Sequence, residues 1–198
     1  MTAIVPSFLG YSGAQLTLDI DHAEHHRRQA AGLGTVTCHG FGGLDILMAL
    51  PHGLPVALTD LTKPQQQYVR RAPAGICTIA DGMVTRHAMR PCRVTMATIH
   101  ANSPTRGAMD SASRFAPFCA RQVIAARPPS PRSPERPLEY GFYGIGLLLE
   151  HENSELETLV PPRPWRPLRH TPAAWWFAER AYAQFLNPPA TMPGRPQP

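Results

Sequence analysis

The sequence predicts an α+β protein that has a mixed or antiparallel sheet with two hairpins and about four to five helices, including an amphipathic C-terminal helix. Three observations support this fold class. Residues 14–20 alternate apolar and polar side chains, an Asp-Gly pair at 81–82 separates two apolar runs, and residues 173–186 carry apolar side chains on one helical face. The expected strands outnumber the helices without alternating regularly with them, which is typical of the α+β class.

The N-terminal part of the chain predicts a strand followed by a helix. The alternation over residues 14–20 is that of a half-buried strand. Asp21 is placed to cap a helix over residues 22–31, which two nearby glycines would end. We expect residues 1–34 to form a strand–helix segment, either separate from the core or part of it.

The main α+β domain is expected over residues 35–187. Thr62 and Gln65 have the spacing of a capping box, in which each side chain reaches the other residue's backbone N–H, and they mark the start of a helix. The other expected elements follow from the same kind of pattern. The helices are residues 44–50, 62–71 and 106–119, and the strands are residues 35–38, 93–101 and 122–126.

Two hairpins are predicted within this domain. Residues 74–80 and 83–87 flank the Asp-Gly pair at 81–82, which tolerates the positive φ of a tight type I′ turn. Residues 141–150 and 156–160 flank a short polar segment and form the second hairpin.

Proline marks the parts of the domain that cannot join a sheet. The chain has 23 prolines, and residues 128–137 are so rich in them that we expect an exposed polyproline-like loop there. Thr171 as cap and Pro172 in the first turn open the last helix. Residues 188–198 are expected to be a disordered tail.

Composition limits the classes of function. No apolar run is long enough to span a membrane, and the N-terminus has no signal-peptide pattern, so we expect a cytoplasmic protein that does not bind membranes. The net charge is +5 and the pI is about 9.4, which favours polyanionic partners. Lys63 is the single lysine, so the basic character is almost entirely arginine. Codon composition in a GC-rich genome is the alternative explanation for that arginine content.

Basic residues recur around the first predicted hairpin. If the hairpin and the helix before it share a face, these side chains would form one patch that contacts phosphates. The candidate nucleic-acid-binding residues are Arg70, Arg71, Arg86, Arg90 and Arg93.

Aromatic residues gather near the C-terminus. Neighbouring aromatic and arginine side chains are typical anchors of protein interfaces, although the same aromatic face could close the core. The candidate partner-binding residues are Trp165, Arg166, Trp175 and Trp176.

Three histidines share one face of the first expected helix. His22, His25 and His26 have the i, i+3, i+4 spacing at which neutral imidazoles can share a metal ion. They form a candidate zinc site, and we expect no other cofactor. A solvated polar helix is the alternative reading.

A glycine-rich stretch follows the expected strand at 35–38. Residues 38–43, Cys-His-Gly-Phe-Gly-Gly, resemble the His-Gly-rich loop of α/β-hydrolases, whose backbone amides help to form the oxyanion hole. Residues 54–60 resemble the next strand of that family, although no Gly-x-Ser-x-Gly elbow follows. The sequence therefore favours a non-enzymatic binding or accessory protein that contacts nucleic acid or a protein. The alternative is a small metal-dependent or hydrolytic enzyme that uses the histidine-rich helix and the loop at His39.

Overall fold

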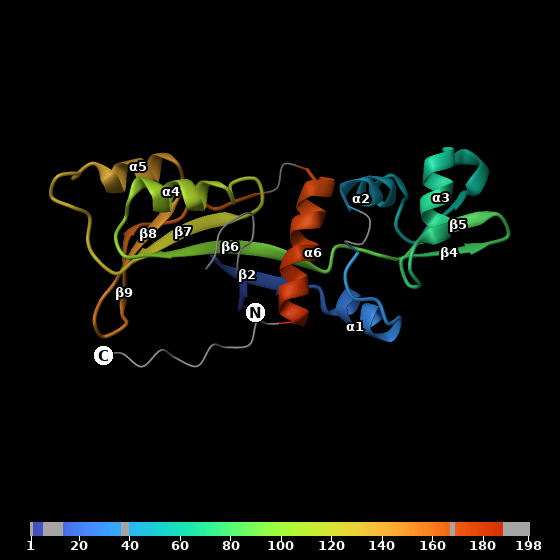
Figure 1. The fold of residues 1–198 in the computed structure, drawn as a ribbon, viewed down its shortest axis with the longest axis horizontal. Coiled ribbons are helices and arrows are strands. Elements are labelled where there is room, and N and C mark those ends of the chain that lie inside the picture. Colours follow the sequence, from blue (N-terminus) through green and yellow to red (C-terminus); the bar gives the residue numbers. More distant parts are fainter. Residues whose placement is uncertain (1, 6–13, 37–39, 167–168, 188–198) are drawn as a thin grey trace. The chain divides into compact units, whose positions relative to one another are not determined.

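The structure is a computed structural model of the 198-residue chain, and it describes residues 2–5, 14–36, 40–166 and 169–187 (Figure 1). The chain divides into two compact units. Unit 1 consists of Leu18–Val94 and Arg166–Ala183, and unit 2 of Thr2–Thr17, Thr95–Trp165 and Gln184–Pro198. The fold is α+β, as predicted, with six α-helices and two sheets in the described residues. The described helices are too short or too polar to cross a bilayer.

The larger sheet has six strands, most of them in unit 2. Their order is β1-β2-β6-β7-β8-β9. Their bounds are β1 Thr2–Val5, β2 Ala14–Ile20, β6 Cys92–Ala101, β7 Ala120–Ala125, β8 Gly146–Glu150 and β9 Leu156–Val160. The sheet is mixed, because β6, β7 and β8 are parallel while the pairs β1–β2 and β8–β9 are antiparallel.

Two helices connect the parallel strands of unit 2. Helix α4 (Arg106–Ser113) joins β6 to β7, and α5 (Arg136–Phe142) joins β7 to β8. Both lie over the same face of the sheet (Figure 1). Their buried side chains share one apolar cluster with the strands beneath them. That cluster contains Ala108, Met109, Ala112, Val123, Ala125, Tyr140, Ile145 and Leu147. The packing fixes the start of each helix close to the carboxyl end of the strand before it.

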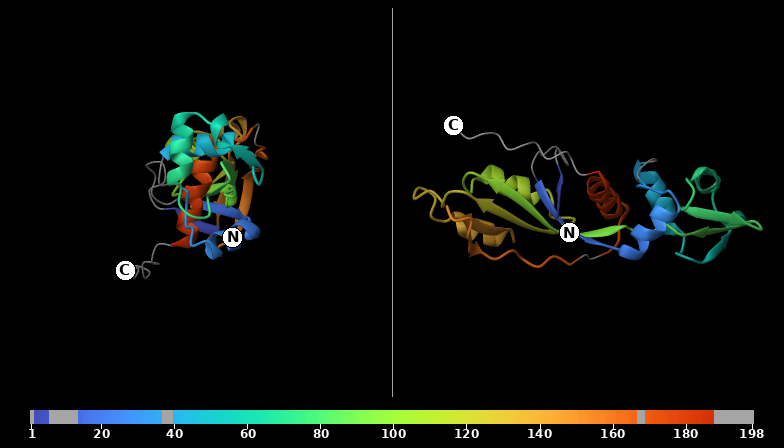
Figure 2. Two further views of the ribbon diagram at one scale, coloured as in Figure 1. Left: turned by 90° about the vertical axis from the view of Figure 1, so that its right-hand side faces the viewer. Right: turned by 90° about the horizontal axis from the view of Figure 1, so that it is seen from below.

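Unit 1 is built around a three-stranded antiparallel sheet of order β3-β5-β4. Its elements are α1 (His22–Ala30), α2 (Gly40–Ala49), β3 (Pro55–Ala57), a 3₁₀ turn (Leu58–Asp60), α3 (Lys63–Arg71), β4 (Cys77–Ala80), β5 (Met83–Arg86) and α6 (Pro172–Leu186), the last of which runs on past Ala183. Helix α3 lies beside the β4–β5 hairpin in both Figures 1 and 2. Val69 of α3 and Val84 of β5 are buried in one cluster there.

Local signals in the sequence predict the ends of several elements correctly. The Asp21 carboxylate accepts a hydrogen bond from the Glu24 N–H at 3.0 Å and caps α1. Thr62 and Gln65 form the capping box of α3. Asp81 and Gly82 have φ values of 50° and 73°, as the tight turn between β4 and β5 requires.

The second hairpin is also present, but its first strand is shorter than predicted. Strand β8 begins at Gly146, because residues 136–142 form α5 instead of the end of a proline-rich loop and the start of a strand. Pro137 lies in the first turn of α5, where the missing N–H breaks no helical hydrogen bond. The buried Tyr140 then holds the helix against the sheet.

Other boundaries differ as well. The helix expected over residues 106–119 ends at Ser113, and turns lead into β7, which begins at Ala120. Of the strand expected over residues 54–60, three residues form β3 and the next three form the 3₁₀ turn. Thr35 and Val36 are not in a strand. The rest of that expected strand, His39 and the expected tail lie outside the described residues. Residues 40–43 of the glycine-rich stretch are not a loop: they form the first turn of α2, which begins four residues before the helix expected over residues 44–50.

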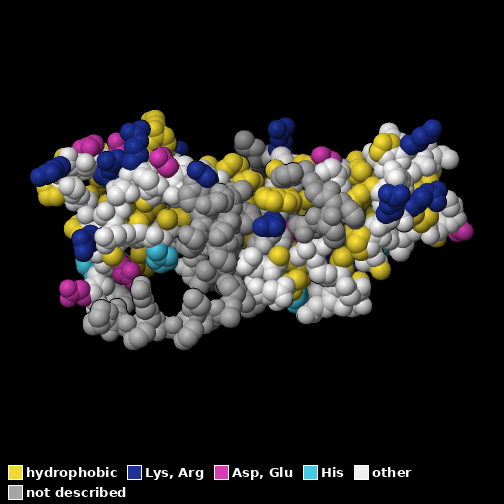
Figure 3. Space-filling view, in the orientation of Figure 1, with side chains coloured by type: hydrophobic (Ala, Val, Ile, Leu, Met, Phe, Trp, Pro, Cys, Tyr) yellow, Lys and Arg dark blue, Asp and Glu magenta, His cyan; other side chains and the backbone are white. Residues whose placement is uncertain are grey.

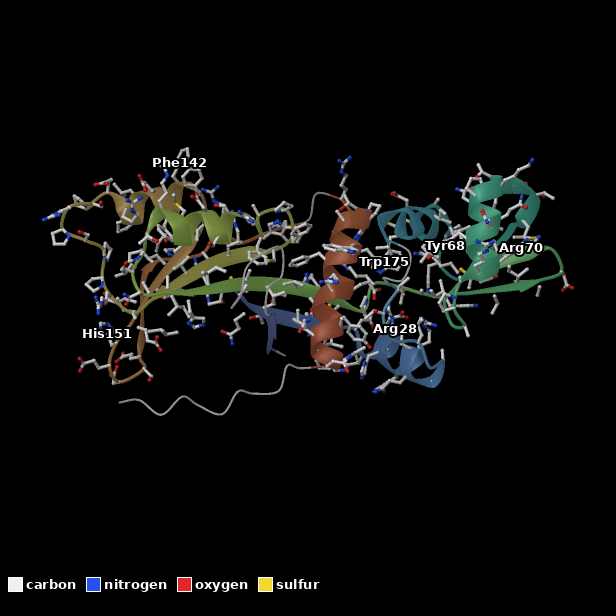
Figure 4. The ribbon with its side chains drawn as sticks, viewed as in Figure 1. Arg28, Tyr68, Arg70, Phe142, His151 and Trp175 are labelled. Carbon is white, nitrogen blue, oxygen red and sulfur yellow. The ribbon has the colours of Figure 1, made fainter. Side chains whose placement is uncertain are left out.

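A buried ion network joins α1 to α6 within unit 1. Arg28 is fully buried, and its guanidinium donates to Glu24 and Glu179 at 2.7 Å each (Figure 4). Glu179 also accepts from the Val36 N–H at 2.9 Å and from the Trp175 indole at 2.8 Å. Burial by itself would lower the pKa of Arg28, but the bonds to Glu179 and Glu24 outweigh it and raise that pKa.

Candidate anion-binding site

A pocket of about 260 Å³ lies in unit 2, where the loops after β6 and β7 meet. Because β6 and β7 are parallel, both loops leave the same edge of the sheet, which is the edge where open sheets of this kind usually bind ligands. The loop after β6 contributes Ser103, Pro104, Thr105 and Arg106, and the loop after β7 contributes Arg127, Pro128, Ser130, Ser133 and Arg136.

The core of unit 2 holds the first of these loops in place. The Thr105 hydroxyl accepts from the Ala108 N–H at 3.2 Å and caps α4. The hydroxyl of the buried Tyr140 donates to the Thr105 carbonyl at 3.1 Å, which ties α5 to the start of α4. The loop after β7 is joined to β6 by a 3.0 Å hydrogen bond from the Ala126 N–H to the Ala101 carbonyl.

The proline-rich loop is held by turns of its own. The Ser130 carbonyl accepts from the Ser133 N–H at 2.9 Å, and the Ser130 hydroxyl accepts from the Arg132 N–H at 3.2 Å. The Ser133 carbonyl accepts from the Arg136 N–H at 3.1 Å and leads into α5. These turns place Arg127 and Arg136 at the same pocket although eight residues separate them.

The lining of the pocket is positively charged. Arg106 and Arg127 are exposed, and neither has a carboxylate partner among the described residues. Arg136 pairs with Glu139 on the next turn of α5. The described lining contains no Asp or Glu, while its serine and threonine hydroxyls can donate further hydrogen bonds. The first amides of α4 also lack helical partners and lie at the positive end of the helix dipole. Such a lining suits an oxyanion, and above all a phosphate.

The structure separates the five predicted nucleic-acid-binding arginines, all of which are in unit 1. Arg70 and Arg71 are exposed in the last turn of α3. Arg70 lies away from Trp175 of α6 (Figure 4). Arg86 and Arg90 line a pocket of about 400 Å³, and Arg90 lines another with Arg93.

Acidic and aromatic side chains lie next to Arg86, Arg90 and Arg93. Arg93 pairs with Asp19 at 3.4 Å, and Asp21 lines both pockets. The Arg86 guanidinium lies 5.6 Å from the Trp175 ring centroid. Burial lowers the pKa of Arg86 and of Arg90. The carboxylates of Asp19 and Asp21 therefore offset part of the positive charge of these pockets, and the phosphate contact predicted for the five arginines stays a prediction.

The three histidines of α1 have different surroundings. His22 and His26 are exposed, whereas the Nδ1 atom of His25 lies 2.7 Å from the Tyr182 hydroxyl. In the described part of the chain, no three His, Cys, Asp or Glu side chains form a group that could hold a metal ion. The zinc site stays a prediction, and His39 lies outside the described residues.

The four residues predicted to bind a protein partner are also spread over the fold. Trp165 is in unit 2, and its indole donates to the Ala116 carbonyl at 3.0 Å. Trp175 is 5% exposed and belongs to the core of unit 1, so it offers little surface to a partner. Trp176 is half-buried beneath Arg180, and Arg166 is exposed. Their role at an interface stays a prediction.

Sequence reasoning missed Arg106, Arg127 and Arg136. The available signal was that two strands, the expected 93–101 and 122–126, are each followed within a few residues by arginine. It becomes informative only once the strands are known to be parallel, because parallel neighbours bring their carboxyl ends together. No known family model, curated protein or solved structure matches this chain.

Proposed function

We propose that the chain is a non-enzymatic, cytoplasmic binding protein that contacts nucleic acid, and that the pocket between β6 and β7 holds backbone phosphates. The observation that supports this most directly is the convergence of Arg106, Arg127 and Arg136 on one pocket without a carboxylate in its described lining. Arginine binds phosphate through paired N–H groups, and phosphate contacts supply most of the affinity in non-specific binding.

The alternative is a metal-dependent or hydrolytic enzyme built on the histidine-rich helix and the loop at His39. The binding role is preferred because the arginine pocket is formed by side chains that two loops bring together, whereas no further ligand joins the histidines among the described residues. The pocket lining consists of arginine, serine, threonine and proline, which suits holding a phosphate group.

The double substitution Arg106→Ala with Arg127→Ala is expected to weaken binding to a labelled DNA of random sequence about tenfold or more at low salt. Each lost phosphate contact should also reduce the slope of log affinity against log salt by about 0.9 for duplex DNA. Fluorescence anisotropy across a salt series measures both quantities, for a duplex and for a single strand.

The matched control is Lys63→Ala with Arg169→Ala, which removes the same charge from exposed positions in unit 1 that belong to none of the candidate sites. We expect the control to lose far less affinity, in proportion to net charge alone. An equal loss in both variants would show that the phosphates do not bind in the pocket. A wild-type chain that binds neither DNA at low salt would refute the proposed function.

A further inference from the structure

An apolar surface adjoins the arginine pocket. Leu138 and Phe142 are both 77% exposed, one turn apart on α5, and Tyr143 directly after the helix is 48% exposed. These are unusual positions for large apolar side chains, since their exposure brings no stability to the unit itself. Phe142 lies on the outer side of α5 (Figure 4).

These side chains line a hollow of about 370 Å³ in unit 2, together with Met109 and two charged residues. One of the charged residues is Arg106, which also lines the arginine pocket, and the other is Glu139, whose carboxylate pairs with Arg136. Helix α5 also links the two sites. Arg136 in its first turn lines the arginine pocket, and Phe142 at its end lines the apolar hollow. Figure 3 shows basic, acidic and hydrophobic side chains interspersed over α4 and α5.

We propose that the ligand is a single-stranded nucleic acid, with phosphates in the arginine pocket and an unpaired base on Phe142. This inference rests on the proposed function and names its substrate class. Aromatic side chains beside a basic groove bind single strands by stacking on bases, without regard to sequence. A duplex keeps its bases stacked on one another and has none to offer to such a surface.

The ring geometry assigns different roles to the two aromatic residues. The Phe142 and Tyr143 ring centroids are 5.2 Å apart, and the ring planes are at 88°. Perpendicular rings cannot both stack on the same base. The more exposed Phe142 therefore takes the base, and Tyr143 supports the Phe142 ring from one side.

Charge sets the direction of the strand. The β8–β9 hairpin begins at the carboxyl end of β8, which is the same edge of the sheet as the arginine pocket. Its tip carries the exposed carboxylates of Glu150, Glu152 and Glu155, which repel a polyanion. A strand anchored in the pocket is therefore directed away from the hairpin and along α5, where the Glu139 carboxylate in the lining of the hollow is paired with Arg136. An uncharged apolar partner would gain nothing from Arg106 at the border of the hollow.

The test is Phe142→Ala, measured by anisotropy with labelled oligo(dT) and with a duplex. We expect the affinity for oligo(dT) to fall about 5- to 100-fold, because one stacked base is lost, while the affinity for the duplex and its salt slope stay unchanged. Phe142→Trp should keep oligo(dT) binding, and Phe142→Leu should lose it, because leucine is apolar but cannot stack. The matched control is Leu54→Ala, which removes another exposed apolar side chain (61% exposed) from unit 1.

The results for the Phe142 variants and for the arginine double variant distinguish base stacking on Phe142 from phosphate binding in the arginine pocket. If Phe142→Ala leaves oligo(dT) binding unchanged while the arginine double variant weakens it, the phosphate pocket stands and the base-stacking role is wrong. If Phe142→Leu binds oligo(dT) as the wild type does, no base stacks on residue 142 and the inference is overturned. If Phe142→Ala changes the sedimentation of the free protein, the surface is an interface between copies of the chain, and the inference is likewise overturned. If the wild type binds no nucleic acid, both proposals fail.

Discussion

Replacing Glu179 with alanine is expected to lower the free energy of unfolding of unit 1 by about 3–5 kcal/mol, because it leaves a buried charge without its main partner. Arg28 is fully buried, and two of its guanidinium nitrogens donate to Glu179, at 2.7 and 2.9 Å. The Val36 N–H and the Trp175 indole would lose their acceptor in the same step. Buried donors without a partner are costly in themselves.

Urea unfolding followed by tryptophan fluorescence measures this effect. Two of the three tryptophans, Trp175 and Trp176, are in unit 1, so Trp165→Phe gives a background that reports on unit 1 alone. Glu179→Gln should fall between the wild type and Glu179→Ala, because the amide oxygen still accepts a hydrogen bond but carries no charge. Asp19→Ala is the control, since it removes a carboxylate that is exposed and paired with Arg93, and it should cost less than about 1 kcal/mol.

The same network gives a second readout in the pH dependence of stability. Burial alone would raise the pKa of Glu24, but hydrogen bonds from Arg27, Arg28 and the Met89 N–H outweigh it and lower that pKa. A carboxylate with a lowered pKa contributes stability above its unfolded pKa of about 4.3, and this stability is lost as the pH falls through the folded pKa. Glu24→Gln should flatten the acid side of the profile. An unchanged profile, or a Glu179→Ala variant no less stable than Asp19→Ala, would contradict the network.

The first helix shows which part of the fold can be predicted from the sequence. Asp21 and the glycines beyond the helix locate α1, because caps act over three or four residues. The face that α1 buries was not predictable. The helical spacing predicts a functional face formed by His22, His25 and His26. The structure instead buries Glu24 and Arg28. The reason for that burial is Glu179, which lies 151 positions from Arg28 along the chain.

The arginine pocket could not be predicted from the sequence for a similar reason, because it depends on how distant segments pair. Arg106 and Arg127 each follow a strand that the sequence predicts, but no local pattern shows that these strands pair in parallel. An antiparallel pair would have placed the two arginines at opposite edges of the sheet. Helix α5 was obscured in another way. Leu138, Tyr140 and Phe142 alternate with the period of a strand, and the prolines over residues 128–137 predict an extended loop. Proline opens a helix as readily as it prevents a strand.

Replacing Gly75 with alanine is expected to destabilise unit 1 by about 2–5 kcal/mol, for two reasons that add. Gly75 has a φ of +83°, which a residue with a Cβ adopts only at a cost. A methyl group at this position would also lie 2.7 Å from the Cβ of Ala31, at the end of α1. If residue 75 moved away from Ala31 to relieve this clash, the 2.7 Å hydrogen bond that Arg27 donates to the Gly75 carbonyl would be strained.

The chain offers a control for each of the two reasons. Gly53 has a φ of +71° with no atom within 4 Å of the added methyl, so Gly53→Ala measures the backbone effect alone, expected at about 1–2 kcal/mol. The steric part is measured by adding Ala31→Gly to Gly75→Ala, which removes the opposing methyl and should restore part of the lost stability in urea unfolding. Additive effects of the two substitutions would mean that the close approach of Gly75 to α1 is relieved by a small backbone shift. A coupling of about 1 kcal/mol or more would show that this packing is rigid, and that glycine is required at position 75 because α1 lies against it.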